Sequence, residues 1–363
     1  MNELTSSYEV ESRSEPTADQ IRPVRILTAF LQKNTLPHAL LFTGIDGVGK
    51  NRIATIFAMT ANCAEKTGPG SPAALPAGEP GLDPCGSCRS CRKIEKGFHP
   101  DILRVQPDGR TIRIHQIRTL IETLSLKPME ASWRVVIIEQ ADTMRPAAAN
   151  ALLKTLEEPP DRTVLILMAG QAADLLPTIV SRCRHVRFHP FSARSIADRL
   201  VSDHGVSAAE ATLAAAASGG SLTRAVEIGN PEWVVWRNWL ITACGLESPQ
   251  NLSQKPMGEL LAFAEQLAKN KSRVPEALEI MTGWLRDLIV VRHNKKHVTN
   301  TDRIDALQEL AKQLPVGTLM TMIDIIRTAR HRIEANSNLR LTLEAMVLRL
   351  SQDCVKEKRL ISN

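Results

Sequence analysis

The sequence predicts an α/β domain with a parallel sheet, followed by a small helical region and an all-helical C-terminal part. Short apolar segments alternate with helical segments over about 21–190, and this alternation winds a parallel sheet in β-α-β units. A glycine-rich loop directly follows the first apolar segment. After about Phe191 the strand signals stop, and Leu, Ala, Met and charged residues recur at helical spacing.

The composition is that of a soluble globular protein. The chain has 363 residues, of which 43% are hydrophobic and 23% are charged. No apolar run is long enough to span a bilayer, and the N-terminus lacks the apolar segment of a signal peptide. We therefore expect a cytosolic protein without membrane contact. The net charge of +6 permits contact with nucleic acid or acidic proteins. The aromatic content of 4% disfavours a single-strand binder built on base stacking.

Each element of the α/β part is predicted from its local pattern. Four short apolar segments are predicted strands, at 38–44, 100–107, 134–142 and 163–170. Three segments between or after them are predicted helices, at 52–64, 113–128 and 145–160. The four consecutive β-branched residues Val135–Ile138 are typical of a strand covered on both faces. Pro146 suits the first turn of the third helix, and Pro159–Pro160 end that helix.

A polar segment precedes this pattern, and a flexible segment interrupts it. Residues 1–20 carry five acidic residues and one basic residue, so we expect a disordered arm. Residues 65–84 are rich in Pro, Gly and Ala, which predicts a flexible insertion in the 21–190 core. Residues 191–229 are expected to form short helices with a break at Gly219–Gly220, and residues 230–363 an all-helical domain.

The loop "GIDGVGKN" is a phosphate-binding loop in every position but the last. Its glycines would let backbone N–H groups wrap phosphates, and they are Gly44, Gly47 and Gly49. Lys50 would reach the outer phosphates. The motif then requires a Ser or Thr hydroxyl for Mg²⁺, and this chain has Asn51 instead.

Two further departures concern the groups that perform hydrolysis. A working site needs an Asp and then a Glu after the strand at 134–138, and this chain has Glu139 and Gln140. Gln140 cannot act as a base. The strand that corresponds to 163–170 usually ends with a polar residue that senses the γ-phosphate, and this chain has no polar side chain there before Gln171. We therefore predict that the chain does not hydrolyse ATP. Binding of ATP or ADP stays open, because the glycines and Lys50 remain.

The cysteines predict a structural zinc site. Three of them fall in "CGSCRSC" and a fourth precedes the insertion, and the set is Cys63, Cys85, Cys88 and Cys91. The C-x₂-C spacing lets two thiolates meet one tetrahedral Zn²⁺. The alternatives are incidental thiols or a redox pair, and a redox pair would not need the third and fourth cysteines. His99 is a spare candidate ligand. A site closed by four cysteines has no open position for catalysis.

Several of these segments together resemble one family. They are "HALLFTGIDGVGK", the cysteine cluster followed by "HPD" at 99–101, "ANALLKTLEEPP" at 149–160 and "SRC" at 181–183. This set resembles the delta-prime family of the bacterial DNA polymerase III clamp loader, which is related to the AAA+ ATPases. The resemblance is dense over about 21–190 and thins beyond it.

The resemblance implies an AAA+ core, a helical lid over 191–229 and a collar over 230–363 that joins a hetero-pentamer. Its partners would be the tau/gamma ATPase subunits and the delta subunit. The loader uses ATP to open a sliding clamp and place it on primed DNA, as part of a DNA-directed DNA polymerase, a nucleotidyltransferase. Delta-prime subunits usually hydrolyse no ATP themselves.

The same resemblance implies two arginine roles. The "SRC" motif would make Arg182 an arginine finger that acts in trans on a neighbouring subunit's ATP. The alternative is an ordinary basic patch with Arg184 and Arg187. Arg224 stands where AAA+ lids often carry a nucleotide-sensing arginine, although a surface arginine is equally compatible with the sequence.

Two other functions are alternatives to a non-hydrolysing loader subunit. An active tau/gamma-like ATPase subunit would need Ser or Thr in place of Asn51 and Asp-Glu in place of Glu139 and Gln140. A stand-alone zinc-dependent nucleic-acid binder would account for the cysteines and the charge, but not for "NALLKTLEEPP" or "SRC".

Overall fold

The structure is a computed structural model that describes residues 18–33, 35–67, 81–248 and 254–361. It divides into two compact units. The first unit is Met1–Ile196 with Gly219–Arg224, and the second is Ala197–Ser218 with Ala225–Asn363. Of the predicted arm, residues 1–17 lie outside the described residues, whereas Ala18–Gln20 form a 3-10 helix, η1. Of the predicted insertion, residues 68–80 lie outside them, and Ala64–Thr67 form the short helix α4.

A five-stranded parallel sheet forms the centre of the first unit, with the order β2-β3-β4-β1-β5. The strands are β1 (Ala39–Thr43), β2 (Ile102–Val105), β3 (Arg134–Ile138), β4 (Thr163–Ala169) and β5 (Arg184–Arg187). The four predicted strands and the predicted parallel sheet are confirmed. Strand β5 is not among the predicted strands, because only Val186 of its four residues is buried. Charged, exposed side chains of this kind are typical of an edge strand.

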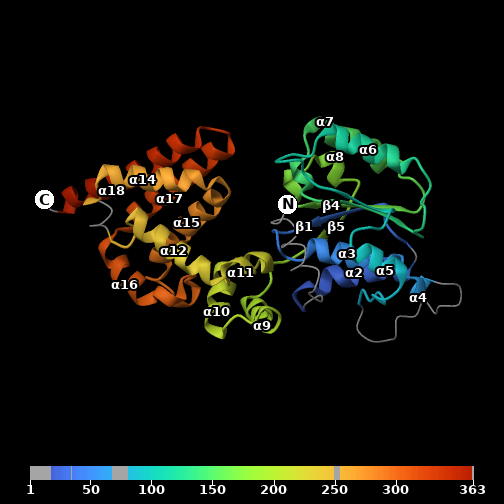
Figure 1. Cartoon of the computed structure of the whole chain (residues 1–363), viewed down its shortest axis with the longest axis horizontal. Coiled ribbons are helices and arrows are strands. Elements are labelled where there is room, and N and C mark those ends of the chain that lie inside the picture. Colours follow the sequence, from blue (N-terminus) through green and yellow to red (C-terminus); the bar gives the residue numbers. More distant parts are fainter. Residues whose placement is uncertain (1–17, 34, 68–80, 249–253, 362–363) are drawn as a thin grey trace. The chain divides into compact units, whose positions relative to one another are not determined.

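Helices cover both faces of the sheet (Figure 1). One face carries α2 (Ile21–Gln32), α3 (Lys50–Ala61) and α5 (Arg89–Glu95), and the other carries α6 (Ile114–Leu124), α7 (Pro146–Glu157) and α8 (Pro177–Val180). On the second face, alternate strand residues such as Leu41 and Leu165 pack in one cluster with Leu120 of α6 and Leu152 of α7. The three predicted helices are thereby confirmed as α3, α6 and α7.

The sheet brings three strand ends together at its carboxyl edge. Thr43 is in register with Ala169, and Ile138 is in register with Leu167. Strand β1 lies between β4 and β5, so both of its neighbours come from distant parts of the chain. In open α/β sheets, ligands bind at this edge, where the strand order changes. The phosphate-loop segment and Glu139 both follow strands that end there.

The second unit is helical over its described residues, as the sequence predicts beyond Phe191. Helices α9 (Ala193–His204) and α11 (Leu222–Ile228) each have residues in both units. The other helices that the structure describes in this unit are α10 (Ala208–Ala217), α12 (Pro231–Cys244), α14 (Met257–Lys269), α15 (Val274–Val290), α16 (Ile304–Gln313), α17 (Val316–Glu334) and α18 (Leu339–Ile361), with 3-10 turns η4 (Lys271–Arg273), η5 (Lys295–His297) and η6 (Thr301–Arg303). Among the described helices, none has the length and apolar character needed to cross a membrane.

Candidate functional site

The glycine-rich loop has the strand–loop–helix context that the sequence predicts. Strand β1 ends at Thr43, and α3 begins at Lys50. The backbone φ angles of the three loop glycines are positive, with 146° at Gly44, 77° at Gly47 and 84° at Gly49. L-residues with side chains rarely adopt such angles, which explains why the loop needs glycine. The loop therefore keeps the backbone shape of a phosphate cradle.

Lys50 is directed into its own loop. The side chain is buried, and its ammonium group donates to the carbonyl oxygens of Gly44 and Ile45 and to the carboxylate of Asp46, with 3.1 Å to Ile45 O and 3.2 Å to Asp46 Oδ1. These contacts use N–H donors of the ammonium group that could otherwise bind a phosphate. A nucleotide would have to replace these contacts.

Glu139 lies beside Asn51, as expected for the two halves of a metal site, but other side chains hold its carboxylate. Asn51 Nδ2 donates to Oε2 over 3.1 Å. The Arg104 guanidinium pairs with Oε1 over 3.3 Å, and Gln106 Nε2 donates to the same oxygen over 3.2 Å. Arg104 also donates to Thr55 Oγ1 on α3 over 2.6 Å. A guanidinium thus neutralises the carboxylate that would serve Mg²⁺ in a working site.

Arg104 and Gln106 are not among the site residues predicted from the sequence. Their signal was present, because they are polar residues two positions apart at the end of an apolar strand, and such residues share one face. Gln140 does not join the group. Its side chain is exposed, and its backbone has a left-handed φ of 47° before the 3-10 turn η2 (Ala141–Thr143). Gln171, at the end of β4, is also exposed and begins the turn η3 (Ala172–Asp174).

The segment Gly219–Arg224 lies against the loop within the first unit. Leu222 N donates to Gly47 O over 2.9 Å. A Cβ atom added to Gly47 would lie 2.2 Å from Ser221 Oγ and 3.0 Å from Thr223 Oγ1. Arg224, the candidate sensor, is half-buried in this segment, and its backbone N–H donates to Ser221 Oγ over 3.3 Å. The structure therefore brings the predicted sensor's segment to the predicted loop.

The four predicted zinc ligands form one cluster. The Sγ atoms of Cys63, Cys85, Cys88 and Cys91 all lie within 4.8 Å of one another. Cys63 follows α3, and the other three lie at or just before the start of α5, where Cys88 is the N-cap residue. Sulfur atoms at these distances could surround one metal ion.

Backbone donors surround the sulfurs. Cys88 N donates to Cys85 Sγ over 3.3 Å, and Cys91 N donates to Cys88 Sγ over 3.4 Å. Burial opposes ionisation of Cys85, but hydrogen bonds from Cys88, Ser87 and Cys63 lower the pKa of this thiol to about 6. A thiolate is the form that binds metal. Burial raises the pKa of Cys91.

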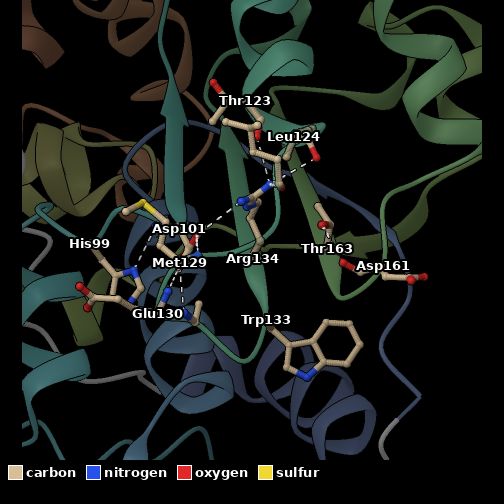
Figure 2. Close-up of polar contacts among 12 residues, drawn as sticks. His99, Asp101, Thr123, Leu124, Met129, Glu130, Trp133, Arg134, Asp161 and Thr163 are labelled. Atoms are coloured by element: carbon tan, nitrogen blue, oxygen red, sulfur yellow. Dashed lines mark hydrogen bonds and ion pairs between the residues drawn. The ribbon is translucent and has the colours of Figure 1, made fainter.

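His99 belongs to a different, structural network (Figure 2). The side chain is buried, and its Nδ1 accepts the backbone N–H of Asp101 over 3.2 Å. The Asp101 carboxylate accepts the backbone N–H groups of Met129, Glu130 and Ala131 at 2.7–3.0 Å. Among the described residues, the metal-compatible cluster consists of the four cysteines and does not include His99. The "HPD" motif therefore anchors the loop after α6 to the start of β2.

Arg182 follows α8 at the surface of the first unit. Its Nη2 donates to Glu157 Oε1 over 2.5 Å, and its Nη1 donates to Thr178 O over 2.9 Å. The side chain is 35% exposed. Burial raises the pKa of the adjacent Cys183 thiol to about 12, so this cysteine stays protonated. Arg184 and Arg187 lie in the edge strand β5 and are exposed.

The chain is thus an α/β phosphate-loop protein that keeps the loop glycines and lysine but has no metal-binding hydroxyl at position 51. A family model described as DNA polymerase III, delta subunit, matches residues 20–192, and one described as DNA polymerase III, delta subunit, C terminal, matches residues 249–352.

Similar proteins point the same way. The chain is 31% identical to DNA polymerase III subunit delta' of Bacillus subtilis, over 92% of this chain and 96% of that protein. It is 29% identical to DNA polymerase III subunit delta' of Pseudomonas aeruginosa, over 86% and 90% of the two chains. It is 26% identical to DNA polymerase III subunit tau of Bacillus subtilis, over 94% of this chain and 62% of that protein. The chain belongs to the delta-prime family of DNA polymerase III, a family of clamp-loader subunits.

Proposed function

We propose that this chain is a non-hydrolysing subunit of the clamp loader. It assembles with tau/gamma ATPase subunits and a delta subunit in a hetero-pentamer, which places the sliding clamp on primed DNA at the replisome in the cytoplasm. Residues 21–190 serve as the AAA+ core, 191–229 as the lid and 230–363 as the collar that joins the ring.

The contacts of Glu139 with Arg104 and Asn51 are the main support for the proposal that the chain does not hydrolyse ATP. A hydrolytic site needs its acidic residue to hold Mg²⁺ and its water shell. Here the carboxylate already has a cationic partner within 3.3 Å, and residue 51 offers an amide instead of a hydroxyl. Neither group can supply the metal with the ligands that hydrolysis requires.

The isolated protein should release no phosphate from Mg²⁺-ATP above background. The measurement is steady-state phosphate release by the unmodified chain and by Lys50→Ala. Phosphate release by the unmodified chain that requires Mg²⁺ and is abolished in Lys50→Ala would contradict the proposal and favour an active ATPase subunit.

Within the loader, we assign Arg182 to a neighbouring subunit's ATP. Negative charge builds on the γ-phosphate oxygens during transfer, and a guanidinium from a neighbour stabilises it, which accelerates phosphoryl transfer by about 10³–10⁵-fold in other systems. The partly exposed position of Arg182 after α8 leaves it accessible to a neighbour. The alternative role, an ordinary basic patch, would make Arg182 equivalent to Arg184.

A reconstituted loader distinguishes these roles. Arg182→Ala should leave assembly intact and lower the ATPase and clamp-loading rates by about tenfold or more, and Arg182→Lys should restore little because lysine lacks the planar fork. Arg184→Ala is the matched control and should load clamps at the unmodified rate. Equal rates for Arg182→Ala and the unmodified loader would show that Arg182 has no such role.

We also assign a structural zinc ion to Cys63, Cys85, Cys88 and Cys91. The donor set supports this assignment, because structural Zn²⁺ sites are tetrahedral and are commonly formed by four cysteine thiolates. The N–H groups that donate to these sulfurs are the outer contacts that such sites use to hold their ligands. The ion would join the end of α3 to the start of α5.

A further inference from the structure

The guanidinium of Arg182 is held by residues from two different helices. Glu157, the last residue of α7, accepts from Nη2 over 2.5 Å. Thr178, in α8, accepts from Nη1 through its carbonyl oxygen over 2.9 Å, and Ser181 Oγ lies 3.5 Å from the same nitrogen. One acceptor alone would leave the side chain free to rotate, whereas acceptors on both terminal nitrogens define the plane of the guanidinium.

These contacts leave part of the guanidinium available. Within the part of the chain that the structure describes, Arg182 Nε makes no hydrogen bond. The side chain is 35% exposed, so the remaining donors can still reach a partner from outside the chain. A guanidinium presents its donors in a rigid fork, and fixing one side of the fork also fixes the direction of the other.

We propose that Glu157 is a positioning residue for Arg182, which holds the guanidinium ready to receive the triphosphate of the neighbouring subunit. This inference rests on the proposed in-trans role of Arg182. Surface ion pairs contribute little to folding, so stability gives this pair no clear purpose. Orienting Arg182 does explain the pair. A flexible arginine must lose its rotamer freedom each time it binds, whereas a preoriented arginine has already lost it.

The chain offers a matched control at the next position. Glu158 is also exposed, but it makes no ion pair in the described chain, and its backbone N–H donates to Lys154 O. Replacing Glu157 or Glu158 removes the same charge from almost the same place. A difference between the two variants therefore reports the contact with Arg182 rather than the local charge.

The test uses the reconstituted loader, with ATPase rates measured against ATP concentration. Glu157→Ala should lower kcat by about two- to tenfold, the range expected from freeing one long side chain, with little change in KM. Glu157→Gln keeps an oxygen acceptor and should restore most of the rate. Glu158→Ala should match the unmodified loader. Arg182→Ala combined with Glu157→Ala should be no slower than Arg182→Ala alone.

The outcomes separate this inference from the role on which it rests. If Arg182→Ala is slow while Glu157→Ala has the unmodified rate, the positioning role is wrong and the finger stands. A Glu157→Ala loader that is faster than the unmodified one also overturns the positioning role, because the carboxylate would then restrain Arg182. If Arg182→Ala has the unmodified rate, the in-trans role itself is wrong. Unchanged thermal unfolding of each isolated variant excludes misfolding as the cause.

Discussion

Asp101 and Arg134 form an ion pair in the interior of the first unit, with 3.5 Å between Asp101 Oδ1 and Arg134 Nη2 (Figure 2). Only 1% of the Asp101 side chain and 4% of the Arg134 side chain are exposed. Arg134 also donates through Nη1 to three carbonyl oxygens, those of Thr123, Leu124 and Leu126, at 2.8–3.4 Å. The pair thus joins the C-terminal end of α6 to the start of β2 and β3. The C-terminal end of a helix favours a cation, and here that cation is the Arg134 guanidinium.

Loss of the Asp101 charge should destabilise the protein. Asp101→Asn leaves the Arg134 guanidinium buried without its carboxylate, so the free energy of unfolding should fall by about 3 kcal/mol. Urea denaturation measures this change. Asp161→Asn is the control, because Asp161 is exposed and accepts its hydrogen bond from Thr163 through the backbone carbonyl oxygen. Equal stability of the two variants would contradict the structural role of the pair.

The same carboxyl should make stability depend on acid. Burial alone would raise the pKa of Asp101, but the N–H groups of Glu130, Met129 and Ala131, together with Arg134, hold its pKa below the ordinary value. A depressed folded-state pKa stabilises the protein above the unfolded-state pKa of about 3.9. That stabilisation is lost as the pH falls through the folded-state value.

The stability difference between the unmodified protein and Asp101→Asn should therefore be constant above about pH 5 and shrink below about pH 4. Urea denaturation at a series of pH values measures it, with Asp161→Asn as the reference. A difference that stays constant far into acid, or grows there, would show that Asp101 ionisation does not contribute in this way.

Replacing Gly47 by alanine should destabilise the protein more than replacing Gly97, a glycine with a similar φ angle. Gly47 and Gly97 have φ angles of 77° and 72°, so alanine costs each about 1 kcal/mol in backbone strain. Only at Gly47 would the added Cβ meet another atom, 2.2 Å from Ser221 Oγ, whereas nothing lies within 4 Å at Gly97. Gly47→Ala should therefore lower the free energy of unfolding clearly more than Gly97→Ala.

Removing the opposing hydroxyl tests the cause. Ser221→Ala added to Gly47→Ala should recover part of the lost stability in urea denaturation, because the closest atom is then absent. The same Ser221→Ala change in the Gly97→Ala background should recover nothing. Recovery in both backgrounds would mean that contact between the loop and the 219–224 segment is not the cause.

The purified protein should carry one zinc ion per chain. Elemental analysis should show that Cys88→Ser loses the metal, since a tetrahedral site of four cysteines does not tolerate loss of one ligand. Cys244→Ser is the control, because Cys244 is buried in the second unit and has no place in the cluster. A strong chelator should also lower the stability of the unmodified protein, because structural zinc contributes folding free energy. Freshly purified protein without zinc would refute the assignment.

Elements with local signals can be predicted from the residues alone. Buried strands such as β3 and β4 are continuous apolar segments, so their existence can be predicted without knowing their neighbours. The loop glycines and the cysteine spacing are also local, since each states what its own backbone or its own ligand geometry requires. The absence of a hydroxyl at Asn51 could likewise be read directly.

Contacts between side chains that are distant in the sequence depend on the three-dimensional fold. Arg104 contacts Glu139 across 35 residues, and Arg182 contacts Glu157 across 25 residues. Strand β5 is identified only by its pairing with β1, because its own residues are mostly charged. One cause applies to all three cases. Periodicity and turn chemistry act over one or two helical turns, whereas the partner of a polar side chain is set by how strands are ordered in the sheet and how helices pack on its faces.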